Sequence, residues 1–429
     1  MKVLMNDKYL GWDLISMQNK WIKLYLIPQI GGRIIQYEMN HYGFFFVNPS
    51  LLGRLPGPSR LGENQSWLNF GGEKIWPWPQ GWNSPEQWPG PPDPILDTGV
   101  YSLQKEPRSN ITPAVTLRSP YDPYTGLQII KDISLSSSRS EATVKATFCN
   151  KSKIPRKWSV WPVCQMNTPD LEEAQNYRII CPTYSESKFK SGYSVLHGLA
   201  NNPQNKIDDY NNLIVEYQYL VGKVGLDSRT GWLAYLDRKR GRVFVLMFDY
   251  QSNEIYPDST SVHIWTQGRG NIYSRNRIID YQNDLVLNPP YVEMELLSPL
   301  KLILPGDSFQ FSYRMLCSII PVCETIKRIS NYGIVALPLT LSIRKTIVNL
   351  TAKYGFFSDG KIKISIEKSS VGKILCLYET TVSPARGADI NLDFEKKLIE
   401  GQDVFLTVNF YDQNSPNPQQ IDEMKINVT

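Results

Sequence analysis

Histidine is scarce in this 429-residue chain, which contains only His41, His197 and His263. A metal centre built from several histidines has few side chains to draw on, and we predict no metal site. The six cysteines form no Cys-x-x-Cys pair, and several lie in apolar segments. Free thiols, mostly buried, are their simplest interpretation. Such thiols are typical of a reducing compartment, so the expected location is cytoplasmic.

Long apolar runs and an excess of one charge are also absent. No segment approaches the ~18 apolar residues of a membrane-spanning helix, and Asp7 and Lys8 interrupt the apolar stretch that a signal peptide needs. The 46 basic and 41 acidic residues give a net charge of +5, which is too dilute to indicate nucleic-acid binding. No Gly-rich nucleotide motif precedes a helical segment. We therefore expect no cofactor, no nucleic-acid partner and no membrane association.

Helical periodicity is scarce too, whereas apolar and polar residues alternate through much of the chain. From Glu141 to Phe148, for example, Ala142 and Val144 share one face and Thr143 lies on the other. Similar segments are Arg33 to Met39, Leu127 to Leu135, Arg156 to Cys164, Val262 to Thr266, Val292 to Leu297 and Ser308 to Cys317. So many long strands predict an all-β chain with a large two-sheet structure.

Two segments break this alternation. Residues 49–99 are rich in Pro, Gly and Trp, and residues 167–212 are polar. Loops of this length inside a compact domain are usually lids or binding loops, and we predict that role for both.

The character of the sequence changes near Pro321. Glu324 to Asn331 predicts a short helical connector, and short strands separated by turn residues follow from Leu337. This pattern predicts a small C-terminal β-sandwich of the immunoglobulin-like kind, with a structural or adhesive role. The expected domains are residues 1–320, a connector over 321–336 and the sandwich over 337–429.

The segment from Trp67 to Pro79 is the first candidate for chemistry. Five of the 11 tryptophans lie between Trp67 and Trp88, and repeated Trp-Pro pairs favour a loop over a helix or an inner strand. The tryptophans can simply anchor irregular backbone. They can also form a carbohydrate platform, because sugar rings pack their C–H faces on aromatic planes. In that case Trp76 and Trp78 hold the ring, and the hydroxyl partners are Asn69, Glu73, Lys74 and Gln80.

The second candidate is the strand from Tyr291 to Leu296. Glu293 and Glu295 are two residues apart, so both point to one face of a strand. In a cleft, their mutual repulsion and burial raise at least one pKa toward that of a general base. Two solvent-facing glutamates are the structural alternative. A glycosidase pair is disfavoured, because carboxylates about 7 Å apart along one strand do not straddle a glycosidic bond.

The order of these segments resembles the galactose-mutarotase-like superfamily, and a bacterial branch of it most closely. The resemblance covers about residues 5 to 320 and rests on four pieces. They are Gly31 to Ile34, Gly71 to Trp78, His263 to Thr266, and Val292 to Glu295 with the turn at Leu304 to Gly306. The resemblance implies a large β-supersandwich and a small-molecule sugar or glycan as partner. It also implies an aldose 1-epimerase-like isomerase, with Glu295 as general base and with Arg33, Trp161 and Gln165 near the sugar.

The sequence departs from the family where the acid is expected. Phe70 stands before Gly71 where the family has a histidine, and Gln165 or its neighbours replace a second one. The substitutes are Lys74, Asp97 and His263. Each has a structural alternative, since Lys74 can pair with Glu293 or Glu295, His263 can be satisfied by neighbouring strands, and Arg33 can clamp a turn. A non-catalytic glycan-binding module, or a lyase or cyclase acting on a non-sugar metabolite, therefore stays open, and the sequence leaves the oligomeric state open.

Overall fold

A computed structural model of the chain describes residues 2–57, 67–84, 86–105, 114–274, 276–368, 374–400, 404–415 and 417–426. The described residues divide into two compact units. The first takes Met1–Ser137, Ala142–Tyr235 and Val245–Met315, and the second takes Ser138–Glu141, Leu236–Phe244 and Leu316–Thr429. Strands dominate both units, and no α-helix occurs in the described ranges. The prediction of an all-β chain is confirmed.

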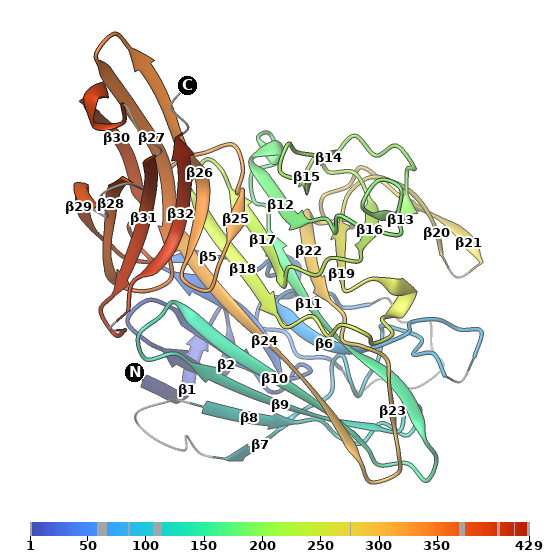
Figure 1. The fold of residues 1–429 in the computed structure, drawn as a ribbon. Helices are drawn as coiled ribbons and strands as arrows, with labels where there is room; N and C mark the ends of the chain where they lie inside the picture. The colour runs from blue at the N-terminus through green and yellow to red at the C-terminus, as the bar shows by residue number, and fades with distance from the viewer. Residues whose placement is uncertain are drawn as a thin grey trace. The chain divides into compact units, whose positions relative to one another are not determined.

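The larger of the two main sheets has 12 strands, ordered β1-β2-β3-β4-β6-β11-β22-β19-β16-β13, with β5 paired to β4 and β23 to β11 (Figure 1). Its strands are β1 (Lys2–Tyr9), β2 (Trp12–Gln18), β3 (Lys23–Ile27), β4 (Arg33–Met39), β5 (Tyr42–Gly43), β6 (Glu73–Trp78), β11 (Arg156–Asn167), β13 (Ser194–Gly198), β16 (Gly222–Leu226), β19 (Val262–Thr266), β22 (Tyr291–Leu296) and β23 (Lys301–Ile303). The two glutamates predicted to share a face lie on β22, near the middle of this sheet.

The second main sheet has 10 strands in the order β14-β15-β12-β17-β18-β24-β10-β9-β8-β7. They are β7 (Ser102–Lys105), β8 (Ala114–Arg118), β9 (Leu127–Leu135), β10 (Glu141–Asn150), β12 (Tyr177–Pro182), β14 (Asn205–Ile207), β15 (Asn212–Glu216), β17 (Trp232–Asp237), β18 (Arg242–Phe248) and β24 (Ser308–Ile319). Tyr37 of β4 donates a hydrogen bond of 3.3 Å to the carbonyl of Met315 in β24. The alternating apolar residues of β10 are fully buried. The two sheets therefore pack face to face, as the alternation predicts.

A two-stranded hairpin and four short 3-10 helices complete the irregular parts. The hairpin consists of β20 (Gly270–Ser274) and β21 (Arg277–Tyr281) and lies against β13. The 3-10 helices are η1 (Pro49–Leu51), η2 (Ala174–Asn176), η3 (Pro257–Ser259) and η4 (Lys396–Leu398). None of the helices in the described ranges has the length and hydropathy of a membrane span. None of the six cysteines, all of which lie in the described ranges, forms a disulfide bond.

The C-terminal part of the second unit consists of two four-stranded sheets. One contains β25 (Arg328–Ile329), β26 (Gly333–Arg344), β27 (Ile347–Phe356) and β30 (Ala388–Glu395), and the other contains β28 (Gly360–Lys368), β29 (Ile374–Val382), β31 (Val404–Asp412) and β32 (Gln419–Ile426). Both contribute to one buried cluster that includes Leu350, Tyr354, Ile364 and Phe410. A shared core between two sheets makes this part a β-sandwich.

Three local predictions are wrong. The segment Glu324 to Asn331 holds strand β25 in place of a helix. Residues 167–212 contain β12, β13 and β14, and the last two are partly exposed because they lie at sheet edges. The Trp-Pro segment forms β6, an inner strand. Proline lacks the backbone N–H that a strand donates to its neighbour. Pro77 is tolerated in β6 because β6 pairs with β4 at one position only, Ile34 with Glu73, so Pro77 has a paired neighbouring strand on the β11 side alone.

Candidate functional site

Four neighbouring strands of the 12-stranded sheet bring the predicted residues to one face. Trp161 of β11 lies opposite Trp76 of β6. Glu293 of β22 lies between Gln165 of β11 and Trp265 of β19. Because side chains alternate along each strand, these residues and their neighbours two positions away point to the same side. Segments far apart in the sequence thereby form one surface.

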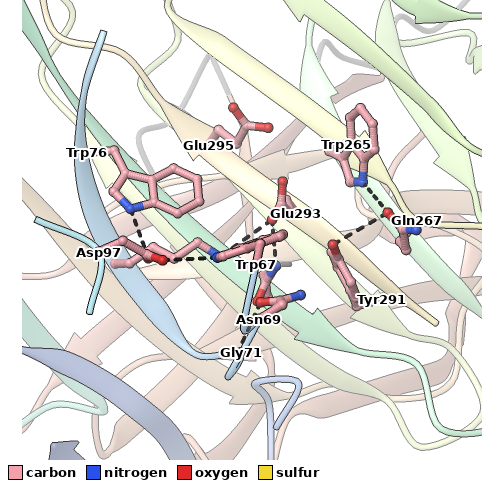
Figure 2. A network of polar contacts seen from close by, with 12 residues as sticks. Trp67, Asn69, Gly71, Trp76, Asp97, Trp265, Gln267, Tyr291, Glu293 and Glu295 are labelled. Carbon is pink, nitrogen blue, oxygen red and sulfur yellow. Dashed lines mark hydrogen bonds and ion pairs between the residues drawn. The ribbon is translucent and has the colours of Figure 1, made fainter. Parts of the chain in front are cut away.

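A cleft of about 570 Å³ opens on this face. Its aromatic wall consists of Trp67, Trp76, Trp82, Trp161, Trp265, Tyr281 and Tyr291. Its polar side chains include Gln80, His197, Lys223, Gln267, Arg277 and Glu293. Figure 2 shows Glu293 between Trp76 on one side and Trp265 on the other. The volume and the mixture of aromatic and polar groups match a site for a small ligand.

Glu293, which lines the cleft, forms an ion pair with the buried Lys74, which does not line it. The Nζ atom of Lys74 is 3.6 Å from Oε1 of Glu293, and Gln165 Nε2 donates a hydrogen bond of 2.7 Å to the same oxygen. Within the described residues, no hydrogen-bond acceptor lies in range of Lys74 Nζ, although it lies over the ring of Trp76, 4.7 Å from the centroid. The ammonium group therefore keeps free N–H donors.

Burial shifts the pKa values of this pair toward each other. It lowers the pKa of Lys74 to about 8, although Glu293 opposes the shift. It raises the pKa of Glu293, and the charge of Glu295 adds to the rise while Lys74 counteracts it. A lysine with a lowered pKa beside a glutamate with a raised pKa is a candidate pair for proton transfer.

Glu295 has a different environment two residues further along β22. It is fully buried and does not line the cleft. Its Oε2 atom accepts hydrogen bonds from Trp161 Nε1 at 2.7 Å and from Lys223 Nζ at 2.8 Å. Burial alone would raise the pKa of Glu295, but Lys223 and His263 outweigh it and lower the pKa to about 2. Glu295 is thus a fixed anion beneath the cleft.

His263 and Trp78 lie with Glu295 beneath the cleft. The Nδ1 atom of His263 is 3.6 Å from Glu295 Oε2, and its Nε2 atom is 2.7 Å from the Thr260 hydroxyl. The ring of Trp78 contacts that of His263 at 5.4 Å. Burial, followed by the charge of Lys223, lowers the pKa of His263. Neighbouring strands therefore hold His263 in its neutral form and away from the ligand.

Asp97 and Arg33 form a buried clamp behind the tryptophans. Arg33 Nη2 is 2.5 Å from Asp97 Oδ1, and Arg33 Nη1 donates a hydrogen bond of 2.9 Å to the carbonyl of Gly71. Asp97 also accepts hydrogen bonds from the indoles of Trp67 at 3.0 Å and Trp76 at 3.2 Å. Donors surround this carboxylate, so its role is to fix the two rings, and Arg33 fixes the turn before β6.

That turn requires its two glycines. Gly71 has a φ of +93°, and a Cβ atom there would lie 2.1 Å from the carbonyl oxygen of Phe46, so only glycine fits. Asn69 accepts a hydrogen bond of 3.3 Å from Gly71 N and does not line the cleft. Its contact stabilises the turn.

Glu73 points away from the cleft. Strand alternation places it on the opposite face from Lys74, where Lys131 of β9 and Tyr313 of β24 both donate hydrogen bonds to its carboxylate. Both partners belong to the 10-stranded sheet, so this network joins the two sheets. Glu73 is fully buried, and the expectation that it takes sugar hydroxyls is not met.

Sequence reasoning missed Lys223 on β16 and His197 on β13. Both line the cleft, and they lie opposite each other in the register of the two strands. Burial, followed by the charge of Lys223, lowers the pKa of His197. The segment around His197 was expected to be a loop, and strand alternation within Gly222–Leu226 was the available signal for Lys223. Across the described ranges, no three His, Cys, Asp or Glu side chains gather as a metal site requires.

Comparison with known structures finds distant similarities. A galactose mutarotase-like protein from Clostridium acetobutylicum matches 73% of this chain over 98% of its own, at 11% identity and a TM-score of 0.44. One from Lactobacillus casei matches 71% over 99%, at 9% identity and a TM-score of 0.44. A galactose mutarotase related enzyme from Lactobacillus acidophilus matches 70% over 95%, at 11% identity and a TM-score of 0.41. These similarities are distant, so we infer the function from the cleft itself.

Sequence comparison places the chain more directly. No curated protein matches it in sequence. The model of a domain of unknown function, DUF4380, matches residues 13–315, which is well over half of the chain. The match includes β6, β11, β19 and β22 and therefore the whole strand framework of the cleft. The chain belongs to the DUF4380 family.

Proposed function

We propose that the cleft binds a small sugar or sugar phosphate and that the chain is an aldose 1-epimerase-like isomerase, which opens and recloses the pyranose ring. One observation carries the proposal. Glu293 lines an aromatic cleft and has a raised pKa, and the buried Lys74, with a lowered pKa, lies 3.6 Å from it. Ring opening needs one group that accepts a proton and another that donates one.

The lining of the cleft supports a sugar as ligand. The rings of Trp76, Trp161 and Trp265 offer faces on which the C–H groups of a pyranose can pack. Gln80, Gln267 and Lys223 offer polar atoms to its hydroxyl groups. The tryptophan side chains are uncharged, so the aromatic wall recognises the shape of the sugar ring. The polar side chains fix the orientation of the sugar.

Glu293 is the better base of the two glutamates on β22. It lines the cleft, and its raised pKa increases its proton affinity. The fully buried Glu295, with a pKa of about 2, binds protons too weakly. In the proposed step, Glu293 takes the proton of the anomeric hydroxyl, the C1–O1 bond becomes a carbonyl and the bond from C1 to the ring oxygen breaks.

Lys74 supplies the matching proton. A protonated ammonium with a pKa of about 8 can donate to the ring oxygen as the C1 bond breaks. The open-chain aldehyde rotates about C1–C2, the ring hydroxyl returns its proton to Lys74, and the new anomeric oxygen takes back the proton from Glu293. Each proton returns to its group, so the cycle is balanced.

Exchange NMR of α-glucose and α-galactose with added protein tests the proposal. We expect interconversion of the anomers to exceed the buffer rate for at least one sugar in a panel of free and phosphorylated aldoses. A rate equal to buffer across the panel contradicts the enzymatic proposal. A non-catalytic glycan-binding module is the second candidate, and it is favoured by the burial of Lys74, whose side chain is 2% exposed. Calorimetric binding without turnover supports that candidate.

A further inference from the structure

A second hollow lies in the first unit beside η3. It has a volume of about 310 Å³ and shares no lining residue with the cleft. Its wall includes Arg229, Tyr250 and Tyr256, together with the hydroxyl-bearing Ser259 and Ser261. The proposed sugar chemistry uses none of these groups.

Arg229 is held between aromatic rings at this hollow. The guanidinium carbon is 3.9 Å from the ring centroid of Tyr184 and 5.4 Å from that of Tyr250. Tyr250 in turn stacks on Tyr256, with centroids 5.0 Å apart and an interplanar angle of 7°. Stacking fixes the plane of the guanidinium and leaves its N–H edge for other partners.

The N–H edge of Arg229 has no hydrogen-bond or ion-pair partner among the described residues. Three carboxylates also line the hollow, and each has another partner. Glu186 accepts from the Tyr184 hydroxyl at 2.6 Å, Asp227 accepts from the Ser187 hydroxyl at 2.8 Å, and Glu254 pairs with Lys301 at 2.5 Å. The guanidinium is therefore oriented but free.

We propose that this hollow is a second binding site, in which Arg229 holds the phosphate or carboxylate group of a hydroxylated small molecule. A planar fork of N–H donors matches either oxyanion in bidentate fashion. Ser261 donates its hydroxyl proton to the Ser228 carbonyl at 2.6 Å, so its oxygen remains an acceptor for a ligand hydroxyl. Ser259 adds an exposed hydroxyl at the opening.

The site is independent of the proposed isomerase chemistry. Thr260, between the two serines, forms a hydrogen bond of 2.7 Å with His263. The segment that lines the hollow therefore also positions the buried His263. No atom that would take or give a proton in the cleft belongs to the hollow. The proposed site can therefore be correct even if the cleft catalyses nothing.

Ligand-observed NMR on the full chain tests the site. The probes are inorganic phosphate, D-glucuronate and neutral D-glucose, each titrated into the wild type, Arg229→Ala, Arg229→Lys and Arg54→Ala. Arg54 is the matched control, because it is also an exposed arginine and lines neither the hollow nor the cleft. Arg229 is exposed as well, so its replacement leaves the core untouched.

We expect phosphate, glucuronate or both to bind the wild type and Arg54→Ala with similar affinity. Arg229→Ala should weaken that binding at least tenfold, and Arg229→Lys should weaken it too, because an ammonium lacks the fork. Binding of one anion and not the other identifies the group. The proposal is overturned if neither anion binds, if Arg54→Ala weakens binding as much as Arg229→Ala, if Arg229→Lys equals the wild type, or if Arg229→Ala weakens glucose binding as much as anion binding.

Discussion

Glu293 and Glu295 point to the same face of β22, yet their surroundings shift the two carboxyl pKa values in opposite directions. Burial raises the pKa of Glu293, whose cationic neighbour Lys74 is 3.6 Å away. At Glu295 burial is outweighed by Lys223, at 2.8 Å, and by His263, and the pKa falls to about 2. Two like groups thus differ in proton affinity, which is raised at Glu293 in the cleft and lowered at the buried Glu295.

The first prediction separates the two glutamates. Glu293→Gln should lower the rate of anomer exchange by about 10²- to 10⁴-fold, the usual contribution of a general base, while sugar binding falls little. Glu295→Gln should leave a larger residual rate, because Glu295 does not line the cleft. Exchange NMR and calorimetry on both variants measure this. If Glu295→Gln folds and loses all activity while Glu293→Gln stays active, Glu295 is the base.

The second prediction concerns the pH profile. Activity requires Glu293 without its proton and Lys74 with its proton. It should therefore rise with pH through the raised pKa of Glu293 and fall above the Lys74 pKa of about 8. Lys74→Arg should be much slower and should lose the alkaline fall, because a guanidinium keeps its proton. A wild-type profile of kcat/KM that stays flat across the alkaline range would rule out Lys74 as the acid.

Much of the strand framework could be predicted from the sequence because alternation is a local signal. It gave the common face of Glu293 and Glu295 and the strands that carry Trp161 and His263. The same rule places Glu73 and Lys74 on opposite faces of a strand. Repeated Trp-Pro pairs favour a loop, however, so the sequence does not indicate that this rule holds for the segment. Pro77 is tolerated because β6 pairs with β4 only between Ile34 and Glu73. This pairing joins distant segments of the chain, so no local sequence pattern predicts it.

The missing part of the candidate site depends on which strands are neighbours. Lys223 reaches Glu295 because β16 lies beside β19, and β19 lies beside β22. Those neighbours come from segments about 70 residues apart, at 222–226 and 291–296, and no local pattern gives their order. His197 was missed for a local reason as well, because β13 is a half-exposed edge strand with little apolar alternation.

The third prediction concerns the ion pair of Lys223 and Glu295. Lys223→Met should destabilise the chain by about 3–5 kcal/mol, because it leaves a buried carboxylate without its cation. The double variant Lys223→Met/Glu295→Gln should recover part of that loss, since no unpaired charge remains. Urea unfolding of both single variants and of the double variant measures the coupling. Additive losses would show that the contact of 2.8 Å contributes nothing.

The fourth prediction follows from the same carboxylate. The folded-state pKa of Glu295 is about 2 and its ordinary value is 4.5, so the folded chain binds this proton more weakly than the unfolded chain. Glu295 therefore contributes stability that is fully present above about pH 4.5 and is lost as the pH falls toward 2. Urea midpoints measured through this range should fall more steeply for the wild type than for Glu295→Gln. Parallel curves would contradict the assigned shift.

The last prediction tests the cleft as a sugar platform without reference to catalysis. Trp265 lines the cleft. Its indole N–H donates a hydrogen bond of 3.1 Å to Gln267 Oε1, and this bond fixes the orientation of the ring. Trp265→Ala should weaken sugar binding about tenfold, through loss of stacking area. Trp21, also half-buried and outside the cleft, is the matched control, and Trp21→Ala should bind like the wild type in calorimetry. Equal effects of the two replacements would mean that the lost affinity reflects general destabilisation and that the cleft does not hold the sugar.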